Sequence, residues 1–307
     1  MNRLVFLILT VILVLPVVIL GTACDEDAPG NIVDDLGRTV SVDEIPERIV
    51  SLAPSITEIL YALDLEDKVV GVTEYCDYPE AATSKPKVGG FSTVDLEAVA
   101  AADPDIVFAA NIHQSETIPA LEDLGYVVVT LAPRTINDVI DNISLVGDIT
   151  GASEEAKTLV FDMTARVNAV SEVTGDLPQS TMPHTLYVTW HDPIYTVGLG
   201  TLTQNLIEKA GGINVAHDIS GHGVISLESA VARNPGVIIA CTGHGSSEDA
   251  PFEWALHSDE LSTSDAREND NVYQINADLA TRGGPRIVEG LEWFAHFLHA
   301  DLFDAPV

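Results

Sequence analysis

Apolar positions between Ser153 and Val173 recur with the period of an α-helix and fall on one face of it. The apolar face comprises Ala156, Leu159, Val160, Met163, Val167 and Val170. Ser153 is placed to cap the first free amides, and Gly175 followed by Pro178 ends the run. At about 1.5 Å per residue such a helix spans roughly 30 Å. The pattern therefore predicts one long amphipathic helix that acts as a rigid strut.

Two copies of one pattern lie on either side of this helix. Residues 96–107 (LEAVAAADPDIV) and 227–238 (LESAVARNPGVI) align without a gap at an offset of 131 residues. Each copy consists of a short helical stretch, an Asp-Pro or Asn-Pro pair and an apolar run typical of a buried strand. We therefore expect two similar α/β lobes joined by the single long helix.

In the first half, short apolar runs alternate with helical stretches. The predicted strands are 49–52, 69–72, 105–109 and 126–131. One helix begins at Pro54, where Ser55 and Glu58 have the spacing of a capping box. Another begins behind Asp95, and a third covers 121–125.

The second half repeats this plan. The predicted strands are 185–189, 237–241 and 272–275. The predicted helices are 202–210, the stretch capped by Ser226, and 286–299. The predicted loops are 217–223 and 276–285. Because strands alternate with helices, each lobe is expected to contain a mainly parallel sheet. Ligands of such sheets bind outside the carboxyl ends of the strands.

Composition and charge narrow the class of protein. The chain has 307 residues, 46% of them hydrophobic, which is enough for two domains. It carries 47 acidic and 14 basic residues, a net charge of −33. Such a field repels nucleic acids and acidic membrane surfaces, so the charge is interpreted as a solvated acidic surface.

The first 24 residues have the features of a targeting segment. Asn2 and Arg3 precede an apolar run over 4–20, and Gly21-Thr-Ala-Cys24 follows. This resembles a bacterial or archaeal lipoprotein signal, in which Cys24 becomes the lipidated N-terminus, although Gly21 stands where leucine is usual. The alternative is an uncleaved anchor, for which the run is slightly short. Both interpretations place the remaining chain outside the cytoplasmic membrane, tethered to it through its N-terminus.

Candidate metal and redox chemistry is sparse. Cys76 and Cys241 are interpreted as separate buried thiols, with a disulfide between the lobes as the alternative. The histidines considered as metal ligands are His113, His191, His217, His222 and His244. None has the spacing of a helical metal pair, so we interpret them as exposed loop histidines, except His222, whose position lines the cleft. We predict no metal site and no cofactor.

The chain resembles the substrate-binding proteins of ABC importers for cobalamin and ferric siderophores. The resemblance extends from Arg48 to the last helix. The matching segments are RIVSLAPSITE (48–58), GVTEYCDYP (71–79), VGG (88–90), DLE (95–97) with PD (104–105), and GGPR (283–286). It implies two α/β lobes joined by one long helix, in agreement with the repeat. The implied organisation is a signal peptide over 1–23, a tether and lead-in over 24–47, lobes over 48–152 and 175–307, and a linking helix over 153–174.

The similarity is greatest to cobalamin binders, which implies ligand contacts at particular residues. Tyr75 matches their tyrosine before Asp-Tyr-Pro, Phe91 their aromatic residue six positions before the first repeated glutamate, and Asp278 their acid before Arg-x-x-Pro-Arg. Trp190 falls at the end of the second half's first strand, where they carry an aromatic residue. Flat apolar rings at strand ends suit a macrocycle. His222 replaces their tryptophan, and its imidazole could also coordinate cobalt or iron.

The repeated glutamates carry a second implication. In the resembling family, the residues that match Glu97 and Glu228 dock onto arginines of the two permease subunits. The predicted function is therefore a membrane-tethered receptor that captures a corrinoid between two lobes and delivers it to an ABC permease dimer with its ATPase subunits. The alternative ligands are a ferric siderophore or haem, and then zinc or manganese. A metal-dependent enzyme is the alternative class, but no nucleophile elbow, phosphate loop or paired metal motif occurs.

Overall fold

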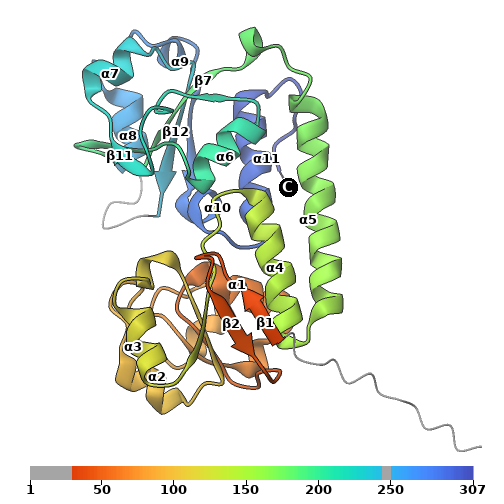
Figure 1. The fold of residues 1–307 in the computed structure, drawn as a ribbon. Helices are drawn as coiled ribbons and strands as arrows, with labels where there is room; N and C mark the ends of the chain where they lie inside the picture. The colour runs from red at the N-terminus through yellow and green to blue at the C-terminus, as the bar shows by residue number, and fades with distance from the viewer. Residues whose placement is uncertain (1–29, 244–249, 307) are drawn as a thin grey trace, which may run out of the picture.

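The computed structural model describes residues 30–243 and 250–306. It contains two four-stranded sheets in two separate lobes (Figure 1), with strand orders β4-β3-β5-β6 and β10-β7-β12-β13. Every neighbouring pair in these two sheets is parallel. If the strands of each sheet are numbered from 1 to 4 in chain order, both sheets have the spatial order 2-1-3-4. The predicted fold, two similar α/β lobes with mainly parallel sheets, is confirmed.

The N-terminal lobe is built on the first sheet. Its strands are β3 (Ile49–Ser51), β4 (Val69–Val72), β5 (Ile106–Ala109) and β6 (Val127–Thr130), and its helices are α1 (Pro54–Ala62), α2 (Leu96–Ala102) and α3 (Thr117–Asp123). The strands are short runs rich in valine and isoleucine, and β3 and β5 are buried throughout, as expected of a parallel sheet covered on both faces. All four predicted strands are present.

The C-terminal lobe repeats this sheet with additions. Its strands are β7 (His184–Val188), β10 (Ile213–Asn214), β12 (Val237–Thr242) and β13 (Val272–Asn276), and its helices are α6 (Leu202–Lys209), α7 (Leu227–Ala232), α8 (Ala250–His257), α9 (Asp265–Glu268), α10 (Ala277–Thr281) and α11 (Ile287–Leu298). A small antiparallel sheet, β11-β9-β8, joins it. Its strands are β8 (Trp190–His191), β9 (Ile194–Val197) and β11 (His222–Val224). The loops predicted over 217–223 and 276–285 are thus partly wrong, because β11 and α10 occupy them.

The internal repeat is confirmed at the level of single residues. The copies become α2 followed by β5, and α7 followed by β12. Asp103 and Asn234, at the same position in each copy, both adopt left-handed backbone, with φ of 46° and 42°. The predicted caps are also present, since the side chain of Asp95 accepts hydrogen bonds from the first turn of α2 and that of Ser226 from the first turn of α7.

The long helix is α5 (Ser153–Thr174), and it runs along the side of the molecule past both lobes (Figure 1). Its predicted cap is wrong: the helix begins after Ala152 without a side-chain cap, and the Ser153 hydroxyl donates instead to Asp148 at 3.0 Å. A second helix, α4 (Ile136–Thr150), was not predicted and packs against α5. A Cβ atom at Gly147 would overlap Ala156, so this contact requires glycine.

The predicted tether and lead-in over 24–47 needs correction. Strands β1 (Gly30–Val33) and β2 (Thr39–Val42) form a hairpin. Buried Asp34 accepts hydrogen bonds from the Arg38 guanidinium at 2.6 Å and from the amide of Thr130 at 3.1 Å, which fastens the hairpin to β6. The predicted signal peptide and Cys24 lie outside the described residues. None of the described helices is both long and apolar enough to cross a membrane.

Candidate functional site

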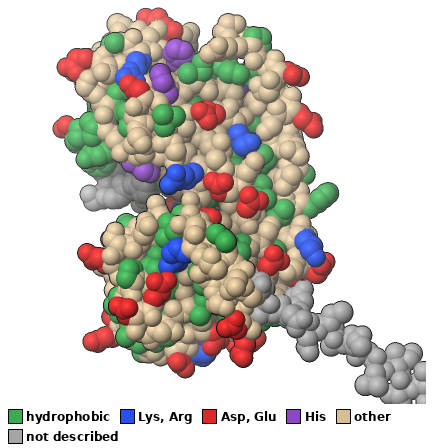
Figure 2. Space-filling model, in the orientation of Figure 1, with side chains coloured by type: hydrophobic (Ala, Val, Ile, Leu, Met, Phe, Trp, Pro, Cys, Tyr) green, Lys and Arg blue, Asp and Glu red, His purple; other side chains and the backbone are tan. Residues whose placement is uncertain are grey.

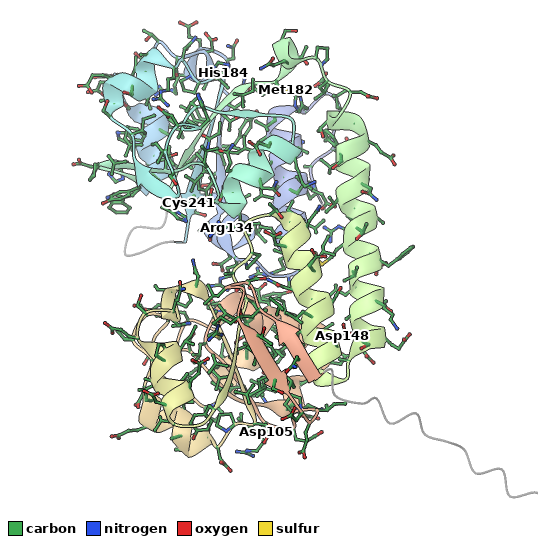
Figure 3. All side chains as sticks on the ribbon, in the orientation of Figure 1. Asp105, Arg134, Asp148, Met182, His184 and Cys241 are labelled. Carbon is green, nitrogen blue, oxygen red and sulfur yellow. The ribbon has the colours of Figure 1, made fainter. Side chains whose placement is uncertain are left out.

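The carboxyl ends of both sheets face the space between the lobes. Figure 3 shows Asp105, just before β5, and His184, at the start of β7, at the outer ends of the two lobes. Cys241, near the end of β12, lies beside the gap between them. Figure 2 shows a hollow between the lobes on the side away from α5. We call this hollow the inter-lobe groove.

On the N-terminal side, the structure brings two predicted aromatic residues together. Tyr75 follows β4 and is 60% exposed. A Cβ atom added to Gly90 would lie 3.6 Å from the Tyr75 ring, so Tyr75 lies against the residue that precedes Phe91. Phe91 is half-buried. Both rings therefore belong to the carboxyl-terminal edge of the first sheet, as the sequence predicted.

His113 is buried, and the prediction that it is an exposed loop histidine is wrong. Only 2% of it is exposed, and burial lowers the pKa of its imidazole below the usual value. Its ring packs edge to face against Phe91, with ring centres 5.7 Å apart. The residue follows β5 in a 3-10 turn that folds back into the lobe. A single sequence has no signal for that turn's direction.

On the C-terminal side, three apolar side chains share one face of the small antiparallel sheet. Trp190 lies opposite Tyr195, and Tyr195 lies opposite Val224. Directly opposed residues of antiparallel strands point to the same side. We call Trp190, Tyr195 and Val224 the hairpin face; Tyr195 is 44% exposed. Tyr195 and Val224 were not predicted, because no strand was predicted over β9 or β11.

His222 belongs to the same small sheet. It is exposed, begins β11 and lies opposite Val197 of β9. Its predicted place in a flexible loop is therefore wrong, because ladder hydrogen bonds order this segment. Its position on the strand beside the hairpin face remains compatible with a ligand contact.

A network of five charged residues joins the lobes at the groove. We define the inter-lobe ion network as Glu58 and Asp77 of the N-terminal lobe with Asp278, Arg282 and Arg286 of the C-terminal lobe. Glu58 is 3% exposed and accepts two hydrogen bonds from Arg286, at 2.6 and 2.9 Å, and one from Arg282, at 3.2 Å. Arg282 also pairs with Asp77 at 2.7 Å and with Asp278 at 2.9 Å.

This network corrects one prediction and qualifies another. Ser55 and Glu58 form no capping box, because α1 begins after Ala53 without a side-chain cap and Glu58 reaches across to the other lobe. Asp278 is half-buried and already paired with Arg282. Burial raises the pKa of the Asp278 carboxyl, and the nearby acids Asp77 and Glu58 add to the rise, against the lowering effect of the arginine charges. The site residues that sequence reasoning missed here are Glu58, Asp77, Arg282 and Arg286.

The enclosed space beside the network is small. A cavity of about 260 Å³ is lined by Glu58, Tyr61, Ala62, Tyr78, Pro79, Pro285 and Arg286. Cavities that hold drug-sized ligands have volumes of about 300 to 1,000 Å³. None of the predicted aromatic residues lines it. A large ligand would therefore be held in the open inter-lobe groove and not in this cavity.

The remaining candidates are distributed as follows. Cys76 and Cys241 are both buried free thiols, as predicted. His217 is exposed as predicted, whereas His191 is half-buried between Trp190 and Trp254, and His244 lies outside the described residues. Within residues 30–243 and 250–306, no group of three or more histidine, cysteine or acidic side chains is arranged to hold a metal ion.

Glu97 and Glu228 occupy matching positions, in the first turns of α2 and α7. Both side chains are exposed, and neither forms an ion pair with a described residue. Figure 1 shows α2 and α7 in different lobes but on the same side of the molecule, opposite α5.

Comparison with known proteins agrees with this architecture. A family model described as "Periplasmic binding protein" matches residues 49–279. The substrate-binding lipoprotein YvrC of Bacillus subtilis, described as part of an uncharacterised ABC transporter, is 32% identical over 280 residues, covering 90% of this chain and 87% of that protein. A cobalamin-binding protein of Halobacterium salinarum is 29% identical over 272 residues, covering 87% and 73%.

A solved structure is similar over the same region. The periplasmic vitamin B12-binding protein BtuF of Vibrio cholerae superposes with a TM-score of 0.74 at 27% identity, covering 83% of this chain and 98% of that structure. These relatives are transport proteins and not enzymes, so the enzyme alternative is set aside. The chain belongs to the periplasmic binding protein family, as a substrate-binding component of an ABC importer.

Proposed function

We propose that this protein captures a corrinoid in the inter-lobe groove and delivers it to an ABC permease dimer with its ATPase subunits. The observation that carries the proposal is the pair of apolar walls at facing strand ends. Tyr75 and Phe91 belong to one lobe, and the hairpin face belongs to the other. Flat rings on two sides suit a flat macrocycle, because they remove its faces from water without needing a deep cavity.

The polar groups beside these walls suit the same ligand class. A corrin ring carries amide side chains at its edge, and these need both donors and acceptors. Arg282 offers a guanidinium, and Asp77, with 59% of its side chain exposed, offers a carboxylate that a ligand amide could approach. Asp278, predicted as the acceptor, would share its carboxylate with Arg282. Two of the relatives described above are named for binding cobalamin or vitamin B12, which supports the proposal.

The test is calorimetric titration of the purified protein with cyanocobalamin, dicyanocobinamide, haemin and a ferric hydroxamate siderophore. We expect one-to-one binding of the corrinoids. Trp190→Ala should weaken that binding more than tenfold, about 1.4 kcal/mol, because the indole is the largest ring of the hairpin face. Phe161→Ala, an exposed ring on α5 away from the groove, is the matched control and should bind normally.

Two results would contradict the assignment. Tight binding of the siderophore or of haemin without heat from corrinoids would move the protein to the alternative ligands, for which exposed His222 is the candidate iron ligand. Equal affinities of the Trp190→Ala variant and the parent protein would remove the hairpin face from the site.

We further infer that the mature chain is anchored outside the cytoplasmic membrane by lipid on Cys24, after removal of residues 1–23. The sequence pattern supports this, and the relative YvrC is named as a lipoprotein. We also propose that Glu97 and Glu228 dock onto the permease. Their support is matching positions, exposure and a common side of the molecule, as a two-fold partner requires.

A further inference from the structure

His113 connects two segments of the N-terminal lobe through both of its ring nitrogens. The backbone amide of Ala110 donates to Nδ1 at 3.0 Å, and Nε2 lies 2.7 Å from the carbonyl oxygen of Phe91. A backbone N–H can only donate and a carbonyl can only accept. Nδ1 must therefore be unprotonated and Nε2 must carry the hydrogen. These two partners select one neutral tautomer.

The surroundings of the ring favour its neutral form. Burial lowers the pKa of His113 and outweighs the hydrogen bonds with the backbone of Phe91 and Ala110, which act to raise it. Within the described part of the chain, no charged side chain contributes to this pKa. A second proton would have to sit on Nδ1, where it would oppose the Ala110 N–H. Protonation of the ring therefore breaks the link to Ala110.

The segment that His113 contacts is a tight turn. The amide of Gly90 donates to the carbonyl oxygen of Thr93 at 3.0 Å, and the amide of Asp95 donates to that of Val88 at 2.9 Å. These bonds hold the ends of the turn, and His113 contacts Phe91 between them. Phe91 follows Gly89 and Gly90, and Gly89 has left-handed backbone with φ of 97°. His113 contacts Phe91 twice, through the carbonyl oxygen and through the edge-to-face ring contact. Tyr75 lies against Gly90 on the same edge of the lobe. His113 is therefore placed to fix the position of Phe91 within this turn.

We propose that His113 is a positioning residue for ligand binding, which holds Phe91 on the N-terminal wall of the inter-lobe groove through a single neutral tautomer. The proposal rests on the proposed function, because Phe91 matters only if the groove binds the ligand. This positioning role makes the affinity for the ligand fall in acid, where the ring becomes protonated. The ring titrates near 6.5 when unfolded, so folding stabilisation from the neutral ring is complete above about pH 6.5 and is lost progressively below it.

Two amide variants separate the two hydrogen bonds. In His113→Gln the side-chain amide nitrogen takes the place of Nε2 and keeps the donor to Phe91. In His113→Asn the side-chain oxygen takes the place of Nδ1 and keeps only the acceptor for Ala110. His257→Gln, at an exposed histidine of α8, is the control. The measurements are cyanocobalamin affinity by calorimetry between pH 5 and 8, and hydrogen–deuterium exchange of residues 88–94 without ligand.

We expect the parent protein and the control to lose about tenfold in affinity between pH 7 and pH 5. The glutamine variant should bind within about threefold of the parent at pH 7 and show a flat pH profile, because its amide does not titrate. The asparagine variant should bind about tenfold more weakly at every pH, and its residues 88–94 should exchange faster. The parent ring should show the Nε2–H tautomer in nitrogen-15 NMR spectra.

Three results would overturn the proposal. Equal affinities and equal exchange in the glutamine and asparagine variants would make His113 a core residue only. A pH profile that persists in the glutamine variant would assign the effect to another titratable group of the site, such as His222 or Asp278. An Nδ1–H tautomer would contradict the geometry even if both variants fail to fold. If no corrinoid binds the parent protein, the ligand assignment fails, and the exchange and NMR measurements still decide the positioning role.

Discussion

The two lobes share one frame but differ directly after their first strand. In the N-terminal lobe, β3 leads almost immediately into α1. In the C-terminal lobe, the hairpin β8–β9 intervenes between β7 and α6 and later pairs with β11. The common frame brings the strand ends to the groove. The inserted hairpin supplies the hairpin face, whereas Tyr75 and Phe91 of the other lobe lie in loops. In the proposed site, the shared topology would therefore fix the location, and the segments specific to each lobe would give the site its shape.

The lobes also differ in the charge they bring to their contact. The N-terminal lobe contributes the acids Glu58 and Asp77, and the C-terminal lobe contributes Arg282 and Arg286. In a chain with a net charge of −33, two of the few cations are placed at the joint between the lobes. This placement suggests that the network sets how the lobes are oriented, since a buried ion pair is weak evidence for stability by itself.

The largest effect is expected at the matching glutamates, and it shows whether both lobes contribute equally to docking on the permease. Glu97→Arg combined with Glu228→Arg should abolish uptake and stimulation of the transporter's ATPase, because each introduced arginine would meet a permease arginine of like charge. Ligand affinity and melting temperature should stay nearly unchanged, since both side chains are exposed. Either single variant should lose a similar share of uptake. Glu172→Arg, on the exposed side of α5, is the control; full uptake by the double variant would refute docking through these residues.

The next effect concerns the charge difference between the lobes. Glu58→Gln leaves Arg282 and Arg286 without their buried anion and should lower the free energy of unfolding by about 3 kcal/mol, measured by urea denaturation at pH 7. Asp77→Asn alters the same network at a largely exposed carboxylate and should cost under about 1 kcal/mol. Equal losses in the two variants would show that burial does not distinguish these acids.

The smallest effect is expected at the left-handed backbone position that both lobes share, Asp103 in one and Asn234 in the other. Asp103→Gly should stabilise the protein by about 0.5 to 1 kcal/mol, because glycine adopts the left-handed conformation without steric cost. Asn234→Gly should change stability little, since it also loses the hydrogen bond that the Asn234 side chain accepts from the amide of Asp265. Thermal unfolding measures both variants. A larger gain at Asn234 than at Asp103 would contradict this account.

Much of the frame was predictable because its signals are local. The main strands of both sheets, helix α5 and the caps Asp95 and Ser226 follow from apolar periodicity and capping chemistry within a few residues. Helix α4 carried the same signals, with a capping box between Thr135 and Asp138, and could have been predicted. The hairpin β1–β2 was harder, because it is stabilised by contacts with β6, which lies far along the chain.

The candidate site contains both residues that local sequence patterns could predict and residues that they could not. Tyr75, Phe91 and Trp190 could be assigned to strand ends from the chain alone, since parallel strands deliver their carboxyl ends to one edge. Glu58 could not: a glutamate in the first turns of a helix has a sufficient local explanation, yet its partners Arg282 and Arg286 lie 224 and 228 residues away. His113 likewise became buried only when its turn folded against Phe91. The order and spacing of the residues determine the secondary-structure elements and the internal repeat. Pairings between residues that are far apart in the sequence depend on how the two lobes pack. Burial then decides the charge state and the partner of each ionisable side chain.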